Sequence, residues 1–256
     1  MGDHRFVKSA LANVVVLTAV VAAVALPATA SGMTTSSQAG NDLRLRFTFD
    51  NGESLEPGTR VRDSSGRRHH GVVRVSGRGH LTIERGVTGR AAGYPAACRG
   101  CGRAIISVND GRGLDPLRRD FRFGVAARVT ARQAKPGRDP NLVQKGLVSQ
   151  DKRQWKLELI GARPKCVVDG RLGRATALSP IPIDNGKWHR LVCSRNGPTL
   201  TLRVDGVVRA TALGRTGRLA NATPLRVGGK ALRAAGQNDQ YHGDLDNVFL
   251  RIDRAS

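Results

Sequence analysis

The stretch Leu200–Ala210, which reads LTLRVDGVVRA, decides the fold class of this 256-residue chain. Apolar residues alternate with polar ones up to Asp205 and Gly206, and valines follow that pair. Alternation with a period of two is typical of a strand with one buried face. An Asp-Gly pair favours a two-residue type I′ turn, because both of its positions adopt positive φ angles. The sequence therefore predicts a β-hairpin here.

The same alternation recurs along the chain, with turn clusters between the apolar runs and no convincing long amphipathic helix. Glycine is abundant, at 31 residues, which suits tight turns. Short strands at such spacing are typical of a sandwich or jelly roll, an all-β fold. Besides the hairpin, the predicted strands are Leu43–Phe49, Gly71–Val75, Leu81–Ile83, Ala104–Val108, Phe121–Val129, Leu142–Val143, Trp155–Leu159, Cys166–Val168, Trp188–Cys193, Leu225–Val227 and Asp246–Ile252.

The N-terminus has the layout of an export signal. Arg5 and Lys8 precede an apolar stretch, Leu11–Leu26, which is followed by Ala28-Thr29-Ala30. A basic segment, an apolar segment and small residues in this order are typical of a secretory signal peptide. The apolar stretch is short for a membrane span, which needs about 20 residues. We expect residues 1–30 to be removed; retention as an anchor is the alternative.

The rest of the chain divides simply. Residues 31–42 are rich in Ser, Thr, Gly and Gln and are predicted to form a flexible linker. Residues 43–254 then form one domain, a size common for all-β sandwiches. The predicted signal peptide indicates that the protein is secreted and is extracellular or associated with the cell wall. No stable membrane span is expected after cleavage.

The formal net charge of +22 comes mostly from arginine. Such a charge attracts acidic polymers. The basic residues are scattered, however, so the charge can also reflect composition alone. Only 4% of the residues are aromatic, and no nucleic-acid-binding motif occurs, so specific nucleic-acid binding is not expected. Arginines could grip sulfate, phosphate or carboxylate groups, but the sequence does not identify which ones face a ligand.

The chain has four cysteines, Cys98, Cys101, Cys166 and Cys193. In an exported protein an even number of cysteines predicts disulfides, and four cysteines allow three pairings. The Cys98-Arg99-Gly100-Cys101 motif could instead be a redox pair or half of a zinc site. No helical pattern follows it, and no second closely spaced pair exists, so structural disulfides are favoured.

Several motifs, taken in order, resemble one known family. The chain is similar to laminin-G-like jelly-roll domains of the concanavalin A-like lectin/glucanase superfamily, of the secreted bacterial, actinobacterial type. The motifs are Phe47-Thr48-Phe49-Asp50, Asp63-Ser64-Ser65-Gly66, Leu114-Asp115-Pro116, Gln144-Lys145-Gly146, Trp188-His189-Arg190-Leu191, Val227-Gly228-Gly229 and Gly243-Asp244-Leu245-Asp246-Asn247-Val248. They cover about residues 43–252.

The resemblance implies two antiparallel sheets of six or seven strands each, packed face to face. In this scheme Cys166 and Cys193 lie in successive, neighbouring strands. Secreted relatives are similar in carrying cysteines at such positions. The resemblance therefore favours a Cys166–Cys193 disulfide, which leaves Cys98–Cys101 as a short local bridge.

The superfamily includes glucanases, so catalysis has to be weighed. The strand-borne Glu-x-Asp-x-x-Glu of its retaining members is absent, and Glu158 has no acidic partner two or four residues further on. The two tyrosines, Tyr94 and Tyr241, lack a sialidase-like context, and no G-x-S-x-G motif occurs. We predict no catalytic residues; a glycan-processing enzyme is the least favoured alternative.

Resemblance to lectin-like jelly rolls also implies a candidate calcium site. Its ligands would be the carboxylates of Asp50, Asp63 and Asp246, brought together because the first and last strands pair. The alternative is that Asp50 and Asp63 only stabilise turns, through hydrogen bonds to nearby backbone. Ca²⁺ is the only cofactor considered.

These observations lead to a secreted, non-catalytic, lectin-like module. Its expected partner is an extracellular or cell-wall carbohydrate or an acidic polymer. The main alternative is a structural or adhesion module that contacts proteins.

Overall fold

The computed structural model describes residues 42–52, 54–98, 101–134, 139–151, 153–232 and 239–254. The predicted signal peptide and nearly all of the predicted linker lie outside these residues. None of the described helices is long and apolar enough to cross a membrane. The described strands all belong to one compact unit, Ser37–Ser256.

The described residues are almost entirely strands and turns. The helical elements are one 3₁₀ turn, η1 (Arg112–Leu114), and one short helix, α1 (Val148–Asp151). The strands are β1 (Leu43–Phe47), β2 (Arg60–Val61), β3 (Gly71–Ser76), β4 (Thr82–Arg85), β5 (Arg90–Gly93), β6 (Arg103–Val108), β7 (Phe121–Thr130), β8 (Asn141–Lys145), β9 (Gln154–Ile160), β10 (Arg163–Asp169), β11 (Arg174–Leu178), β12 (Asn185–Asn196), β13 (Thr199–Val204), β14 (Val207–Leu213), β15 (Leu225–Val227) and β16 (Asp244–Ile252).

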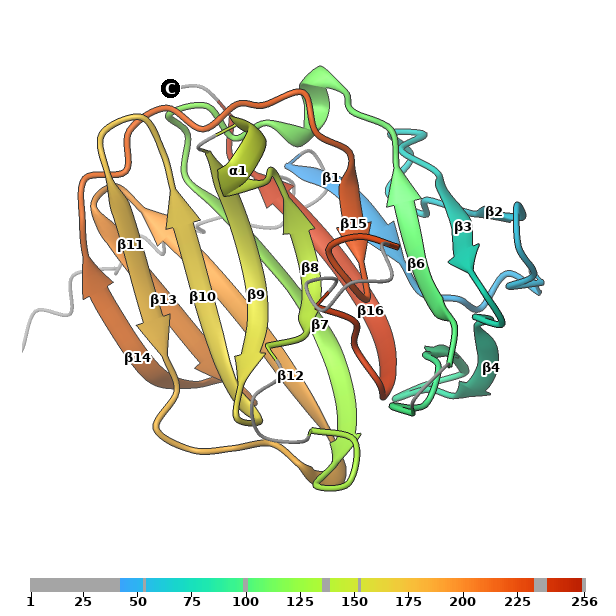
Figure 1. The fold of residues 1–256 in the computed structure, drawn as a ribbon. Helices are drawn as coiled ribbons and strands as arrows, with labels where there is room; N and C mark the ends of the chain where they lie inside the picture. Colours follow the sequence, from blue (N-terminus) through green and yellow to red (C-terminus); the bar gives the residue numbers. More distant parts are fainter. Residues whose placement is uncertain are drawn as a thin grey trace, which may run out of the picture. The chain divides into compact units, whose positions relative to one another are not determined.

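The strands form two antiparallel eight-stranded sheets, which confirms the predicted sandwich. Sheet A has the order β14-β13-β12-β7-β16-β5-β4, and β1 also pairs with β16. Sheet B has the order β11-β10-β9-β8-β15-β6-β3-β2 and forms the front layer in Figure 1. The first and last strands, β1 and β16, pair as expected for a jelly roll.

The core lies between the two inner faces. Phe121 and Phe123 of β7 stack with ring centroids 5.6 Å apart, and Trp155 of β9 packs 4.6 Å from the Phe123 ring. All three side chains are buried. Because alternate residues of a strand point to opposite faces, the predicted period-two pattern places these rings between the sheets.

The predicted hairpin is present. Asp205 and Gly206 have φ angles of 53° and 82°, the two positive values of a type I′ turn, and Val204 pairs with Val207. The prediction succeeded because turn chemistry and hydrophobic alternation agree there.

The disulfides have the favoured pairing, but Cys166 and Cys193 do not lie in neighbouring strands of one sheet as expected. Cys166 lies in β10 of sheet B and Cys193 in β12 of sheet A, so their bridge joins the two sheets, with a Cα–Cα distance of 5.8 Å. Both residues are fully buried because they point inward from facing sheets. The expectation of neighbouring strands was wrong. Cys98–Cys101 forms a local bridge, with a Cα–Cα distance of 5.2 Å.

The predicted count of six or seven strands per sheet was too low, because β2, β5 and β11 were missed. In β5 and β11 the buried positions are alanines, such as Ala91, Ala92, Ala175 and Ala177. Alanine has low strand propensity. These segments are strands because neighbouring strands pair with them.

Candidate functional site: an arginine-lined cleft

A cleft of about 670 Å³ opens at one end of the sandwich. Its walls are the β10–β11 turn, the end of β12 with the turn that follows, and the segment after β14, which runs along the top of Figure 1 toward β15. Its lining includes the side chains of Arg118, Arg171, Leu172, Arg195, Arg215 and Arg218.

Backbone contacts fix two of these walls against each other. The N–H groups of Arg171 and Leu172 donate to the carbonyl oxygens of Arg218 and Thr216, both at 3.0 Å. A Cβ at Gly170 would lie 2.2 Å from the Thr216 carbonyl oxygen, so only glycine permits this approach. The arginines on the two walls therefore face the same opening.

Arg195 is the buried member of the lining and is only 3% exposed. Its Nη1 donates to the Gly217 carbonyl oxygen at 3.1 Å and to Thr216 Oγ1 at 3.4 Å, and its Nη2 donates to the Arg119 carbonyl oxygen. The guanidinium also lies 4.9 Å from the centre of the Phe121 ring. All these partners are uncharged.

The guanidinium of Arg195 therefore contacts no carboxylate directly. Burial lowers the pKa of the Arg195 guanidinium, and the negative charge of Asp120 acts in the opposite direction. Asp120 uses Oδ1 to accept a hydrogen bond from Gly197 N–H, at 2.7 Å. Among the described residues, no carboxylate forms an ion pair with Arg195, and its Nε has no hydrogen-bond partner. A buried charge without an opposite charge is costly, so this position favours an incoming anion.

The other four arginines of the cleft are exposed and extend the positive surface outward. Within the described part of the chain, none of them forms an ion pair with a carboxylate. Guanidinium groups bind carboxylate, sulfate and phosphate through paired hydrogen bonds. The cleft can therefore hold a ligand with several negative charges.

Sequence reasoning did not single out these arginines, although a signal for them exists. The two loops that carry Arg171, Arg215 and Arg218 both read Gly-Arg-x-Gly-Arg, at residues 170–174 and 214–218. The motif recurs far apart in the sequence, and only the pairing of the sheets brings the two copies together.

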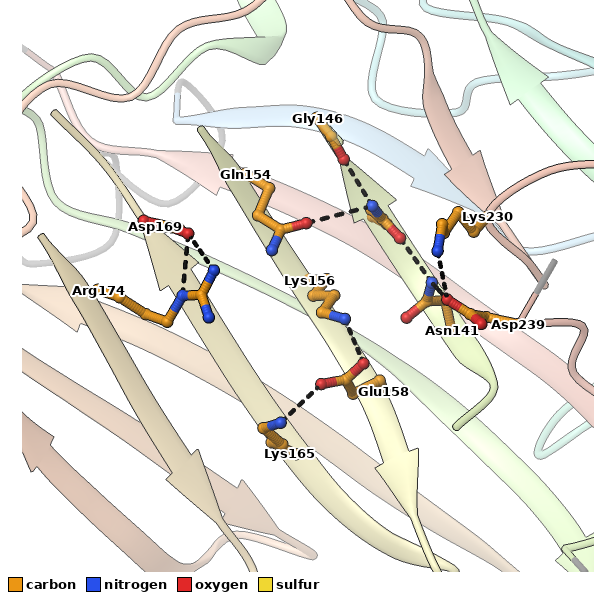
Figure 2. Close-up of polar contacts among 11 residues, drawn as sticks. Asn141, Gly146, Gln154, Lys156, Glu158, Lys165, Asp169, Arg174, Lys230 and Asp239 are labelled. Carbon is orange, nitrogen blue, oxygen red and sulfur yellow. Dashed lines mark hydrogen bonds and ion pairs between the residues drawn. The ribbon is translucent and has the colours of Figure 1, made fainter. Parts of the chain in front are cut away.

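The outer face of sheet B shows the opposite arrangement of charge (Figure 2). Glu158 of β9 lies between two lysines: Lys156 pairs with Oε2, and Lys165 pairs with Oε1 at 3.1 Å. Nearby, Arg174 Nε donates to Asp169 Oδ2 at 2.9 Å. Each of these positive charges has a carboxylate partner on the same sheet.

Amides continue this network toward β8. Asn141 Nδ2 donates to Gln144 Oε1 at 2.6 Å, and Gln144 Nε2 lies 3.4 Å from Gln154 Oε1. Lys230 pairs with Asp239 at 3.3 Å. Most polar groups on the outer face of sheet B therefore have partners on that face. The neighbours of Glu158 are lysines and not a second carboxylate.

The three carboxylates predicted to bind calcium do not lie together as one cluster. Asp63 turns back onto its own loop and onto β1: Oδ1 accepts from Arg46 N–H and Ser65 N–H, and Oδ2 accepts from His69 N–H, each at 2.9 Å. Across the described residues, no group of three or more His, Cys, Asp or Glu side chains is arranged to hold a metal ion. Asp63 therefore stabilises a turn, as in the alternative stated above.

Asp50 and Asp246 do meet, at the turn between β4 and β5. Asp50 Oδ1 accepts from Arg90 N–H at 2.8 Å, and Asp246 Oδ2 accepts from Val87 N–H at 3.0 Å. Burial raises the pKa of Asp246, the N–H groups of Val87 and Asn247 oppose this, and the charge of Asp50 raises it further. These two carboxylates tie β1 and β16 to the turn.

The chain is similar to one protein family and to several solved structures. Residues 142–252 match the laminin G domain family. The binding domain of Paraclostridial Mosquitocidal Protein 1 has a TM-score of 0.61 and 14% identity, over 85% of this chain and 50% of that one. The binding domain of Botulinum Neurotoxin DC in complex with SialylT has a TM-score of 0.58 and 11% identity, over 85% and 49%. This chain thus spans about half the length of these two toxin domains.

A third structure is covered almost completely. Domain 4 of AbnA, an extracellular GH43 arabinanase from Geobacillus stearothermophilus, in complex with arabinotriose, has a TM-score of 0.58 and 14% identity, over 84% of this chain and 94% of that domain. No curated protein sequence matches the chain. At these identities the structures share the fold, and the resemblance to laminin-G-like jelly rolls is confirmed.

Proposed function

We propose that this laminin-G-like jelly roll is a secreted, non-catalytic module that binds an acidic extracellular or cell-wall glycan in the arginine-lined cleft. The single observation that carries the proposal is a cluster of cleft arginines that lack carboxylate partners. Its five arginines form no ion pair with any carboxylate of the described residues, and the guanidinium of Arg195 is buried among neutral groups. An anionic ligand would supply the missing negative charge.

Two further observations favour a glycan as that ligand. Domain 4 of AbnA, which this chain covers almost completely, is in complex with arabinotriose, so a domain of this architecture can bind carbohydrate. The cleft also contains Leu172, whose side chain is 66% exposed and could contact the apolar face of a sugar ring. Laminin G domains and disulfides favour an extracellular protein.

The test is calorimetric binding of the purified protein to a sulfated polysaccharide, a polyuronate and a neutral arabinan. The variant R171Q/R215Q/R218Q removes three exposed charges from the cleft, and R60Q/R85Q/R112Q removes three exposed charges elsewhere. We expect the cleft variant to weaken binding of one acidic polymer by roughly 100-fold, at about 1 kcal/mol per lost charged contact. The matched control should change the affinity far less.

Salt separates specific binding from diffuse attraction. At about 0.5 M salt most long-range charge attraction is screened, so a shaped site should keep its preference for one acidic glycan. Equal losses in the two triple variants, with no selectivity at high salt, would contradict a cleft site.

Exposure of Leu172 also fits a second candidate, an adhesion module that contacts a protein at the same cleft. One structure of the Botulinum neurotoxin DC binding domain holds rat synaptotagmin II, a protein ligand. In that case Leu172→Ser should abolish the contact in high salt, whereas glycan binding should depend mainly on the arginines.

A further inference from the structure

Aromatic side chains point to a second feature, on the outer face of sheet A. Of the aromatic residues that the structure describes, all are buried except Trp188 of β12 and Phe249 of β16. Both lie on this outer face, on the two strands that flank β7, because Trp188 pairs with Arg128 and Phe249 pairs with Gly124. A chain with so few aromatics leaves two of them accessible on one surface.

Phe249 forms part of a groove of about 350 Å³. Val125 and Ala126 of β7 also line it. The Phe249 ring lies over Gly124: a Cβ at position 124 would be 2.8 Å from Phe249 Cε1 and 2.3 Å from the Leu191 carbonyl oxygen. Glycine therefore gives the ring its place against the sheet.

Asn247 contributes a polar group to the same groove. It lies in an irregular part of β16, between Asp246 and Phe249, where the pairing with β7 shifts register, and its φ angle is 49°. A bulge of this kind re-aims a side chain and is common beside functional sites. Arg46 Nη2 lies 3.5 Å from Asn247 Oδ1, and the Asn247 side chain also hydrogen-bonds to the neighbouring Asp246 carboxyl, so the amide is held at the edge of the groove.

Arg190 places an unpaired cation at the groove. Its backbone N–H donates to Asp205 Oδ1 at 2.8 Å, but its guanidinium forms no ion pair with any carboxylate that the structure describes. Arg251, also in the lining, is different because it pairs with Asp42 at 2.7 Å. The local charge left over is positive and belongs to Arg190 and Arg46.

We infer that this groove is a separate subsite for one uronic acid residue of a glycan. The sugar ring packs against Phe249, its carboxylate pairs with Arg190, and its hydroxyl groups contact Asn247 and Arg46. Such a combination of one aromatic surface with a few placed polar groups is typical of small-ligand sites, and the carboxylate supplies the charge that Arg190 lacks. The inference deepens the proposed glycan binding but depends on none of the cleft arginines.

The test uses a short oligogalacturonate, with an uncharged oligosaccharide of the same length as its neutral counterpart. Binding is followed by calorimetry and by tryptophan fluorescence, because Trp188 lies on this face whereas Trp155 is buried. Phe249→Leu keeps an apolar side chain without the ring, and Asn247→Gly keeps the positive φ without the amide. Arg190→Gln removes the charge, and Arg203→Gln removes an exposed charge from the neighbouring strand β13 as the control.

We expect each of the three groove variants to weaken oligogalacturonate binding roughly tenfold, with unchanged melting temperature, while Arg203→Gln has little effect. The neutral oligosaccharide should bind weakly to every variant. If Phe249→Leu and Asn247→Gly bind as the wild type does while the cleft variant R171Q/R215Q/R218Q loses binding, the subsite is refuted and the proposed function stands. If the groove variants lose binding while the cleft variant keeps it, the subsite stands and the cleft assignment fails.

Discussion

The arginine-lined cleft and the outer face of sheet B contain the same kinds of residue and treat them in opposite ways. On sheet B, Lys156 and Lys165 share Glu158, and Arg174 pairs with Asp169, so each of these positive side chains contacts a carboxylate in the same sheet. In the cleft, Arg195 is buried among neutral acceptors. The positive side chains behind the net charge of +22 therefore contact carboxylates in one region and lack such partners in the other.

The two regions also differ in how they are built. The outer face of sheet B, called the paired face because its charged side chains form ion pairs, belongs to one sheet. Strand register alone therefore sets its geometry. The cleft is built from both sheets, because its walls follow β10 in one sheet and β12 in the other. Cys166 and Cys193 lie just before those walls and join them covalently. We infer that the cleft depends on the packing of the sheets and the paired face does not.

Removal of the inter-sheet disulfide should have the largest effect. The variant C166A/C193A opens a link between residues 27 apart, which corresponds to about 3.5 kcal/mol of unfolding free energy. Because the same link fixes the cleft walls, binding of acidic glycan should fall as well. Urea unfolding and calorimetry measure the two effects.

The local disulfide is the control. C98A/C101A removes a bridge between residues only three apart, for which the same relation gives a smaller loss, about 2 kcal/mol. Its effect on glycan affinity should be negligible. A loss of affinity equal to that of C166A/C193A would show that the inter-sheet link has no special role in the cleft.

Removal of the carboxylate on the paired face should have the next largest effect. Glu158→Gln leaves two lysines without their shared partner, and Glu158 itself is buried. We expect a loss of about 1–2 kcal/mol, below the range for fully buried pairs because both lysines are partly exposed. The variant should also gain weak affinity for acidic polymers, because its two lysines, like the cleft arginines, then have no carboxylate partner.

Asp169→Asn is the matched substitution, because Arg174 is 52% exposed. An exposed pair contributes little, so unfolding free energy should change by less than about 1 kcal/mol. If Glu158→Gln lowered the unfolding free energy no more than Asp169→Asn does and gained no affinity for acidic polymers, the proposed difference between paired and unpaired charges would be wrong.

The cleft arginines should contribute little to stability. In R171Q/R215Q/R218Q the unfolding free energy should stay within about 0.5 kcal/mol of the wild type, or rise slightly because repulsion between like charges decreases. Thermal unfolding at low salt measures this. A loss as large as that of Glu158→Gln would mean that these side chains serve the fold rather than a ligand.

Chelation should have the smallest effect. The carboxylates of Asp50, Asp63 and Asp246 accept hydrogen bonds from backbone N–H groups, and the described residues form no three-ligand cluster. We therefore expect EDTA to leave the melting temperature unchanged. A clear decrease that added Ca²⁺ reverses would show that calcium stabilises the protein.

Much of the fold could be predicted from sequence because its signals are local. Alternation identifies β7, β9 and β13, and the Asp205-Gly206 pair identifies its hairpin. Strands whose buried positions are alanine, as in β11, lack that signal. The setting of the Cys166–Cys193 bridge could not be predicted, because only the packing of the sheets makes the two strands face each other.

The sites show the same limit. Scattered arginines could be counted but not placed, since Arg171 and Arg215 meet only after β10 and β14 have joined different sheets. For the three aspartates, proximity of the first and last strands was predicted correctly, but Asp63 turns away to its own loop. The sequence reports which residues are available, and long-range pairing decides which ones meet.

The most direct test of the central claim observes Arg195 itself. Its Nε–H has no acceptor among the described residues, so its NMR signal, assigned with the variant Arg195→Lys, reports on an anion that enters the cleft. We predict that an acidic oligosaccharide shifts the Arg195 Nε–H signal in a saturable way, with an affinity equal to that from calorimetry. Saturable binding that leaves this signal unmoved, while signals from the outer face of sheet B shift, would contradict the account.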